Sequence, residues 1–353
     1  MLSRVLRRAR GAWGHVRLRA LLFRPARNAR ARAVRRGAAS SGGTTLVVAN
    51  AYNRSESVPE IARFSAYVDR LGGGRLRIVV VNGWASRADR DEERTVLEDL
   101  ARGVADLAWT GARAVGAVFG VGSIDPLLAP LLFPDEEAVR RFLVAAPLAP
   151  LLAPLREVGV RGLALMPGEL RRPFGITGAL VRPEDWRGKV IRTHASLTAE
   201  ATIRALGATP VLRSARELGG GPPREIDGMD LAPRTVVVRA HPGWLTWNVP
   251  LWPRLLLLAV NQESFKRLSV ADQAVLEEAA RRTTAHSAKL PRLTQLEMPV
   301  SVRVVEASEH DLSLLREELR PVHDELRSTR NGEKTLAYVE RFLDAHSRAR
   351  PSA

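Results

Sequence analysis

The chain has 353 residues, of which 45% are hydrophobic, so it can bury a sizeable core and form two lobes or domains. Its formal net charge of +16 is unevenly distributed: residues 1–36 contain twelve arginines and no acidic side chain, which leaves 42 basic against 38 acidic residues in the rest. A nucleic-acid binder needs a basic face on its folded body, and this nearly balanced body argues against that class. The chain has no cysteine, which excludes disulfides, thiolate catalysis and cysteine-ligated zinc.

Residues 1–43 form an Arg-, Ala- and Gly-rich leader. A secretory signal needs an uninterrupted apolar run of about 7–15 residues after a basic start. The best candidate, residues 18–23, is interrupted by Arg19, so the sequence shows no convincing export signal. We interpret the leader as disordered or as a degraded export signal, and the alternative is a basic tail that touches anionic lipid or nucleic acid.

Alternating strands and helices are predicted from Thr44 onward, because apolar runs of strand length alternate with segments of helical periodicity. Strands are expected over 45–49, 75–82 and 161–166, with a further strand that ends near Trp109. Helices are expected from a cap at Ser57 or Glu56 to Gly72, over 92–102 and over 136–144. Such alternation implies an α/β fold with a parallel sheet. Residues 167–173, which contain two prolines and a glycine, are predicted to be a loop that crosses into a second lobe.

Residues 182–212 carry the clearest functional signal. A short strand over 189–192 is followed by Ser196 as a helix N-cap, a helix over 199–206 closed by Gly207, and a return strand over 209–212. Ligands of open α/β sheets bind at the carboxyl ends of strands, where Arg192 lies. A guanidinium matches a carboxylate with two parallel hydrogen bonds. The alternative is that Arg192 pairs with a surface glutamate.

The remaining chain returns to the first lobe and then to the second. A strand is predicted over 255–261, a long helix from about 262 through His286, a late strand over 300–305, and two final helices. Residues 217–224 are predicted to be a Gly-rich loop.

The order of these motifs resembles the solute receptors of TRAP transporters, a family that includes C4-dicarboxylate and sialic acid receptors. The likeness rests on Pro183-Glu184-Asp185, Arg187-Gly188-Lys189-Val190-Ile191-Arg192, Leu206-Gly207-Ala208, Pro210-Val211, Ile226-Asp227-Gly228-Met229-Asp230 and Leu131-Leu132-Phe133, in family order over about residues 44–345. It implies a two-lobed, periplasmic-binding-protein-like α/β fold with a ligand cleft between the lobes. Lobe I would comprise 44–168 plus about 256–298, and lobe II 169–255 plus about 299–350.

The resemblance also implies which residues contact the ligand. Arg192 is expected to bind a carboxylate, and Arg172 is expected to be a second ligand-facing arginine, with Arg171 as a competitor. Asp230 lies where the family has a glutamate. The next residue, Leu231, replaces a ligand-binding asparagine, so the usual dicarboxylate or sugar-acid specificity is in doubt.

Two first-lobe positions complete the candidate site. Asn50, together with Tyr52, follows the first strand and could supply polar contacts. Trp109 ends a strand and could stack on a ligand or pack beneath the cleft. His194, beside Arg192, could form a hydrogen bond with the ligand or have a structural role at the end of the strand.

The sequence contains no nucleophile motif, phosphate loop, dinucleotide fingerprint or histidine pair with metal-ligand spacing. No catalytic residue, metal or cofactor is therefore expected. The predicted function is capture of a small organic acid, and the resemblance implies delivery to a TRAP membrane permease and an extracytoplasmic location. The alternatives are a sensor or scavenger without a permease, and an enzyme that uses the same cleft.

Overall fold

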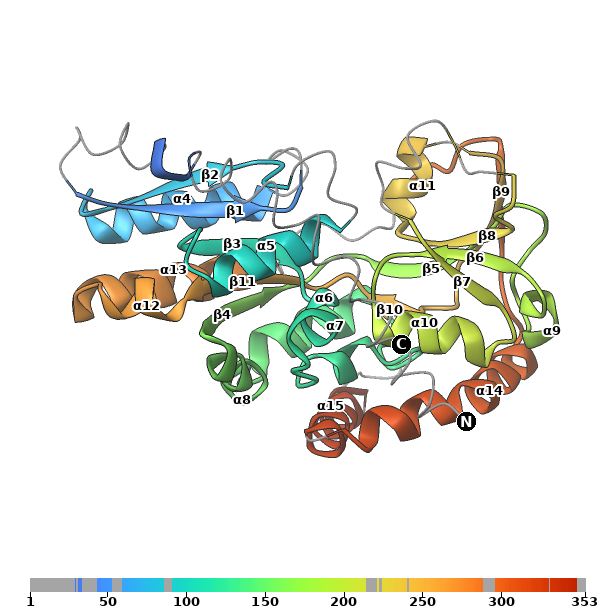
Figure 1. Cartoon of the computed structure of the whole chain (residues 1–353). Coiled ribbons are helices and arrows are strands. Elements are labelled where there is room, and N and C mark those ends of the chain that lie inside the picture. Colours follow the sequence, from blue (N-terminus) through green and yellow to red (C-terminus); the bar gives the residue numbers. More distant parts are fainter. Residues whose placement is uncertain are drawn as a thin grey trace.

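The computed structural model describes residues 29, 31–33, 43–52, 59–85, 91–213, 221, 224–239, 241–287, 296–329 and 331–347. Most of the leader and most of residues 217–224 lie outside the described residues; of the leader, residues 29 and 31–33 are helical, and Ala31 is buried in the core. The described chain forms two β-sheets that lie side by side, each covered by helices (Figure 1). We call the part around the five-stranded sheet lobe I and the part around the seven-stranded sheet lobe II.

Lobe I is built on a sheet with the strand order β2-β1-β3-β11-β4. Its strands are β1 (Thr44–Asn50), β2 (Leu76–Val81), β3 (Leu107–Gly111), β4 (Val160–Met166) and β11 (Leu256–Asn261). Its helices are α4 (Pro59–Gly72), α5 (Glu92–Ala101), α6 (Ala114–Phe119), η3 (Asp125–Leu128), α7 (Glu136–Ala145), α8 (Ala149–Leu152), η4 (Ala153–Val158), α12 (Gln262–Lys266) and α13 (Val270–Ser287). Apolar side chains of α4 and α13 pack on the outer face of this sheet.

Lobe II is built on a sheet with the strand order β12-β9-β5-β8-β6-β7, and β10 pairs with β5. Its strands are β5 (Leu170–Gly175), β6 (Val190–Thr193), β7 (Thr209–Leu212), β8 (Gly228–Leu231), β9 (Gly243–Thr246), β10 (Trp252–Pro253) and β12 (Val302–Val305). Its helices are α9 (Pro183–Trp186), α10 (Leu197–Ala205) and α11 (Pro233–Arg239). The exact division of the chain into lobes stays a prediction.

The β6–α10–β7 unit forms as its sequence predicts. The Ser196 side chain accepts a hydrogen bond from the Ala199 amide, which caps α10. Gly207 ends the helix at a φ of +78°, a conformation that costs glycine little. β6 then pairs in parallel with β7, so Arg192 faces Val211 in register at the end of the sheet.

Three expectations about local structure are wrong. The predicted long helix from about 262 through His286 is two helices, α12 and α13, because Ser269 accepts from the Asp272 amide and begins a new helix. The predicted loop over 167–173 is in part strand β5, which pairs with β8, β9 and β10. Pairing with three strands that are distant in sequence outweighs the local effect of Pro173. The first sheet is also not wholly parallel, because β11 enters antiparallel between β3 and β4. β11 follows the lobe II strands in the chain and enters the lobe I sheet from the opposite direction to β3 and β4.

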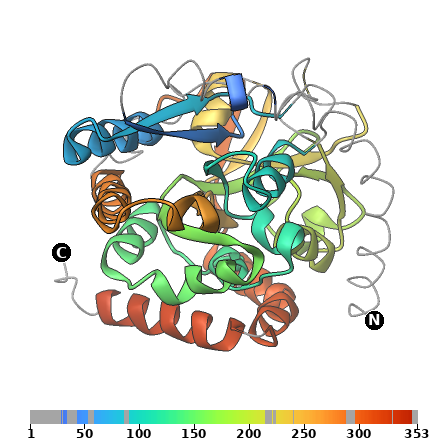
Figure 2. The same ribbon diagram turned by 60° about the vertical axis from the view of Figure 1, so that its left-hand side comes forward.

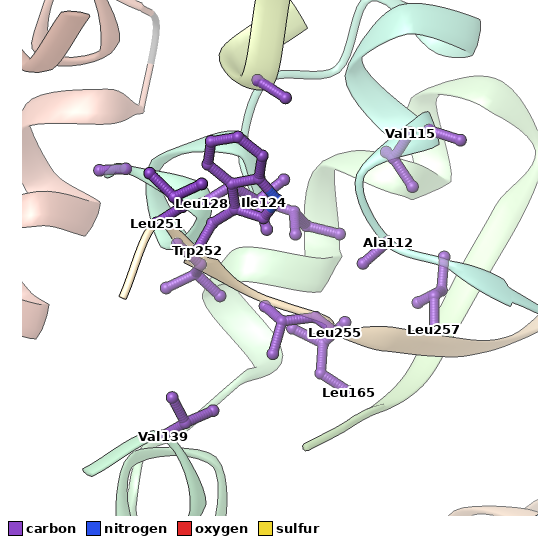
Figure 3. Packing of buried hydrophobic residues seen from close by; sticks show 14 of the residues in the cluster. Ala112, Val115, Ile124, Leu128, Val139, Leu165, Leu251, Trp252, Leu255 and Leu257 are labelled. Atoms are coloured by element: carbon purple, nitrogen blue, oxygen red, sulfur yellow. The ribbon is translucent and has the colours of Figure 1, made fainter. Parts of the chain in front are cut away.

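One hydrophobic core continues beneath both lobes. It joins Ile191 and Ile203 of lobe II to apolar side chains of lobe I, and Trp252 of β10 packs with Ile124 and Leu128 of the η3 region (Figure 3). Helix α14 (Glu309–Arg327) packs against α9 and α10 on one side and against η3 on the other. Helix α15 (Gly332–Ser347) packs on α7 and η3, and both helices run along one side of the molecule (Figure 2).

Within the described ranges, no single helix has the length and hydropathy needed to cross a membrane. Residues 136–145 and 149–158, which meet at a 90° bend, satisfy the length and composition requirements only when they are taken together.

Candidate functional site

Charged and polar side chains from both lobes gather near the junction of the two sheets. We call them the arginine cluster. Its members are Tyr52, Glu93, Arg113, Arg171, Arg192, His194, Asp230 and Arg254. Arg113 follows β3 of lobe I, whereas Arg192 and His194 lie at the end of β6 in lobe II. Burial lowers the pKa of His194, and the positive charges of all four arginines of the cluster lower it further, so these side chains lie close to the ring.

Arg192 is only 1% exposed and has no carboxylate within ion-pair distance among the described residues. Its Nε and Nη2 donate to the Arg213 carbonyl oxygen at 2.9 and 2.6 Å. Nη1 makes no hydrogen bond within the described part of the chain. Burial lowers the pKa of Arg192 to about 9, and the negative charge of Asp230 works against that shift. The guanidinium is therefore still a cation at neutral pH, although no described carboxylate pairs with it.

His194 fixes the orientation of that guanidinium. Arg192 Nη2 lies 3.1 Å from His194 Nε2, and arginine can only donate, so Nε2 accepts. Burial and the nearby arginines hold the pKa of His194 well below its usual value, which keeps the ring neutral. The proton of the neutral ring is then on Nδ1, which is buried and has no hydrogen-bond partner in the described part of the molecule.

Asp230 binds a different arginine from the one expected to hold the ligand. Arg171 Nη1 lies 2.9 Å from Asp230 Oδ2 and also donates to the Asp230 carbonyl oxygen. The register of β5 against β8 places Asp230 opposite Pro173, two residues from Arg171, which brings both side chains to one face. Burial lowers the pKa of Arg171, and Asp230 opposes this. The pair is an internal, nearly dry ion pair.

Lobe I contributes a second neutralised arginine. Glu93 of α5 accepts from Tyr52 Oη at 2.8 Å and lies 2.8 Å from Arg113 Nη2. The carboxylate occupies space beside Gly111, where a Cβ would come within 2.5 Å of Glu93 Oε1. Burial, with the Glu93 charge, raises the pKa of Tyr52, so the phenol stays neutral. Arg113 and Glu93 therefore cancel each other's charge at the end of β3.

Arg254 lies on the segment that joins β10 to β11 and thus connects the lobes. Its guanidinium lies 5.1 Å from the centroid of the Tyr52 ring, a cation–π contact. It is half-buried and makes no ion pair with any described carboxylate. The sequence did not single out Arg254, although a lone charge between Pro253 and the apolar strand β11 is a signal that could have been used. Arg113, a charge directly after a buried strand, is a similar signal.

Arg172 lies outside this cluster and is held by an internal network. Its Nη1 and Nη2 bind the two oxygens of Glu136 at 2.7 and 3.2 Å. Nε donates to the Trp247 carbonyl oxygen at 2.6 Å, Nη1 also donates to the Leu170 carbonyl oxygen, and the guanidinium stacks on the Trp247 ring. Four donor contacts are thus used within the protein. This arrangement favours a structural role, since Glu136 lies on α7 of lobe I and Arg172 on β5 of lobe II.

The two remaining candidates hold the protein's own structure. Asn50 is fully buried; its Nδ2 donates to Asn82 Oδ1 at 2.8 Å, and its Oδ1 accepts from the Tyr52 amide at 3.0 Å. It therefore fixes the loop that presents Tyr52 to the cluster. Trp109 is 0% exposed in the core between the lobe I sheet and its outer helices. The sequence left packing and ligand stacking open, and this burial favours packing.

Comparisons with known proteins agree with this fold. Residues 51–218 match the family described as bacterial extracellular solute-binding protein, family 7 (DctP). The C4-dicarboxylate-binding periplasmic protein DctP of Rhodobacter capsulatus is 23% identical over 297 residues, which cover 79% of this chain and 84% of that protein.

Solved structures extend the likeness to the whole fold. A TRAP periplasmic solute-binding protein from Ralstonia eutropha H16, with bound (S)-2-acetolactate, has a TM-score of 0.72 at 19% identity and covers 85% of this chain and 99% of its own. Another from Desulfovibrio desulfuricans, with bound sn-glycerol-3-phosphate, has a TM-score of 0.72 at 18% identity. The match covers 88% of this chain and 99% of that protein. Residues 51–218 are thus similar to the DctP-type solute-binding family, and the fold of the chain is that of TRAP periplasmic solute-binding proteins.

Proposed function

We propose that the protein binds a small organic acid between its lobes and that the ligand carboxylate pairs with Arg192. The observation that carries this proposal is a buried guanidinium at the end of β6 that has no carboxylate partner among the described residues. An unpaired buried charge costs several kcal/mol, and a fold that keeps one gains from it only when an anion arrives. The Nη1 donors of Arg192 are available for that anion.

His194 assists this binding. Its Nε2 holds Arg192 Nη2 in place, and its buried Nδ1–H has no acceptor among the described residues, so it is a second donor that a ligand oxygen could use. Carboxylates bound to arginine gain charge-assisted hydrogen bonds, which are about twice as strong as neutral ones. Closure of the lobes around the acid would remove water from these contacts and strengthen them further.

Delivery to a membrane permease and an extracytoplasmic location belong to the same proposal. They are supported by the periplasmic relative and by the family match. A gene for a multi-span membrane protein beside the gene for this chain would support a transport role over a sensor or scavenger. Radius of gyration measured by small-angle scattering should fall when a saturating acid is added, because the lobes would close.

Isothermal calorimetry with a panel of organic acids tests the Arg192 assignment. Arg192→Lys keeps the positive charge and loses the planar fork, so we expect affinity to fall at least a hundredfold, or about 2.7 kcal/mol. Arg204→Lys is the matched control, because Arg204 lies on the exposed side of the neighbouring helix α10 and pairs only with Glu200. Unchanged affinity in Arg192→Lys would rule out Arg192 as the carboxylate contact.

A further inference from the structure

One turn of lobe I is held in a backbone conformation that its residue disfavours. Leu131 has a φ of +59°, and no other non-glycine residue in the described part of the chain has a positive φ. The Leu132 amide donates to the Ala129 carbonyl oxygen at 3.3 Å, which closes a β-turn with Pro130 and Leu131 at its centre. A turn with proline first and a positive φ second is normally completed by glycine or asparagine. Leucine is strained there, because its Cβ crowds the carbonyl oxygen that follows.

Contacts with the lobe II chain hold this strained turn in place. The Leu131 amide lies 3.2 Å from the carbonyl oxygens of both Pro250 and Leu251 and donates to them. These two residues lead directly into β10, which pairs with β5 of the lobe II sheet. Figure 3 shows Leu251 and Trp252 beside Leu128, which precedes the turn. The Leu131 amide therefore keeps these acceptors only while residues 250–251 stay against lobe I.

The same contact is linked to the arginine cluster. The Leu251 amide donates to the Arg171 carbonyl oxygen at 2.8 Å, and the Arg171 side chain pairs with Asp230. On the other side of the turn, His323 Nε2 of α14 donates to the Pro130 carbonyl oxygen at 2.8 Å. The strained turn thus lies between a C-terminal helix and the segment that crosses from the site of lobe II into lobe I.

We propose that the turn over residues 129–132 opposes lobe closure, because its strain at Leu131 exists only while the lobes are closed. This inference rests on the proposed function, since it assumes that the lobes open and close around the site. The described arrangement encloses the site, with Arg192 only 1% exposed, and we take it as the closed form. When the lobes separate, residues 250–251 move away, the Leu131 amide loses its acceptors and the residue returns to a negative φ. The strain therefore favours the open form until an acid binds.

Glycine and alanine at position 131 separate backbone strain from side-chain packing. Both variants lose the same leucine contacts, but only glycine adopts a φ of +59° at little cost. Leu131→Gly should therefore raise the ratio of closed to open molecules about fivefold relative to Leu131→Ala. Leu132→Gly and Leu132→Ala are the matched control, because Leu132 is also half-buried and its φ is not positive. The control pair should show no such increase.

Distances between two spin labels measure this ratio in the full chain without any ligand, by pulsed electron paramagnetic resonance. The chain has no cysteine, so Ala66→Cys on α4 and Val238→Cys on α11 place one label on each lobe. Both positions are exposed. Calorimetry with succinate, lactate and D-galacturonate is a second readout. Any of these acids that binds should bind about fivefold more tightly to Leu131→Gly than to Leu131→Ala, since affinity scales with the closed population.

The outcomes separate this inference from the proposed function. Identical distance distributions for Leu131→Gly and Leu131→Ala would overturn the inference, and so would an equal shift in the Leu132 pair, which would reflect loop flexibility alone. The expected shift in distances without binding of any of the three acids would support the strained turn and count against the proposed function. If Leu131→Gly does not fold, Leu131→Asn takes its place, because asparagine also tolerates a positive φ.

Discussion

Two buried arginines of lobe II, twenty residues apart, have opposite surroundings. Arg172 on β5 is bound by both oxygens of Glu136 and by two backbone carbonyls, so its charge and most of its donors are satisfied within the protein. Arg192 on β6 is more deeply buried, yet among the described residues its donors contact only the Arg213 carbonyl and a neutral histidine. The first arrangement joins the lobes, and the second is suited to receive an anion.

This contrast shows that residue type and spacing alone do not assign a binding arginine. What matters is whether the fold provides the counter-charge. Buried ion pairs lose several kcal/mol when one partner is removed, whereas removal of a buried charge without a partner relieves a cost. Stability measurements therefore separate the two arginines independently of any ligand.

The largest loss of stability is expected at the ion pair between Arg172 and Glu136. Arg172→Met should lower the free energy of unfolding by about 3–5 kcal/mol, because Glu136, whose side chain is only 14% exposed, loses its ion-pair partner. The double variant Arg172→Met with Glu136→Leu should recover most of this loss, which urea denaturation would measure as a coupling energy. Additive losses in the double variant would mean that the two side chains do not act as a pair.

Asp125 extends the comparison to a buried acid. Burial raises the pKa of Asp125 to about 7, and among the described residues it has no ion-pair partner. A native pKa above the unfolded value of 3.8 means that the folded state holds the proton more tightly. Stability is therefore fully present below about pH 4 and falls as pH rises to about 7, by up to about 4 kcal/mol at 1.36 kcal/mol per unit.

Asp125→Asn should remove most of that decline in stability. Above neutral pH the variant should therefore be more stable than the wild type, and in acid the two should be equally stable. Thermal melts between pH 4 and 8 would measure this. Asp69→Asn on the exposed side of α4 controls for the loss of one negative charge. A wild-type stability that does not fall between pH 4 and 7 would contradict the burial of a lone carboxylate.

A smaller effect is expected in lobe I. Tyr52→Phe removes the 2.8 Å hydrogen bond to Glu93 but leaves the ring under Arg254. The free energy of unfolding should fall by about 1–2 kcal/mol, since Glu93 keeps its ion pair with Arg113. A loss above about 4 kcal/mol in chemical denaturation would show that the Glu93–Arg113 pair depends on the phenol.

The smallest effect concerns the leader. A chain that starts at Thr44 should melt within a few degrees of the full chain, because an arginine-rich segment without apolar periodicity buries little, and of its described residues only Ala31 packs in the core. Differential scanning calorimetry of both forms would detect a drop of more than a few degrees, which would mean that the leader packs on the body.

Local sequence signals predicted local structure well. Ser196, Gly207 and the β-branched residues of β6 act within a few residues of themselves, so the β6–α10–β7 unit could be derived from the chain alone. β5 was not recognised as a strand, because its stability comes from β8, β9 and β10, and its partners in β10 lie more than eighty residues away along the sequence.

The candidate site was predictable only in part for the same reason. The position of Arg192 at a strand end follows from the chain, but its lack of a counter-charge depends on every carboxylate around it. Glu136 reaches Arg172 across 36 positions, and Asp230 reaches Arg171 across 59. Such pairings are set by the tertiary fold, and no sequence spacing indicates them.

The most direct test of this account compares Arg192→Met with Arg172→Met in calorimetric binding and in thermal melting. We expect Arg192→Met to abolish measurable binding of the acid while keeping or raising the melting temperature, because a buried charge without a partner is removed. Arg172→Met should lower the melting temperature while the folded fraction still binds. The opposite pattern, with binding lost only in Arg172→Met and retained in Arg192→Met, would contradict the central claim.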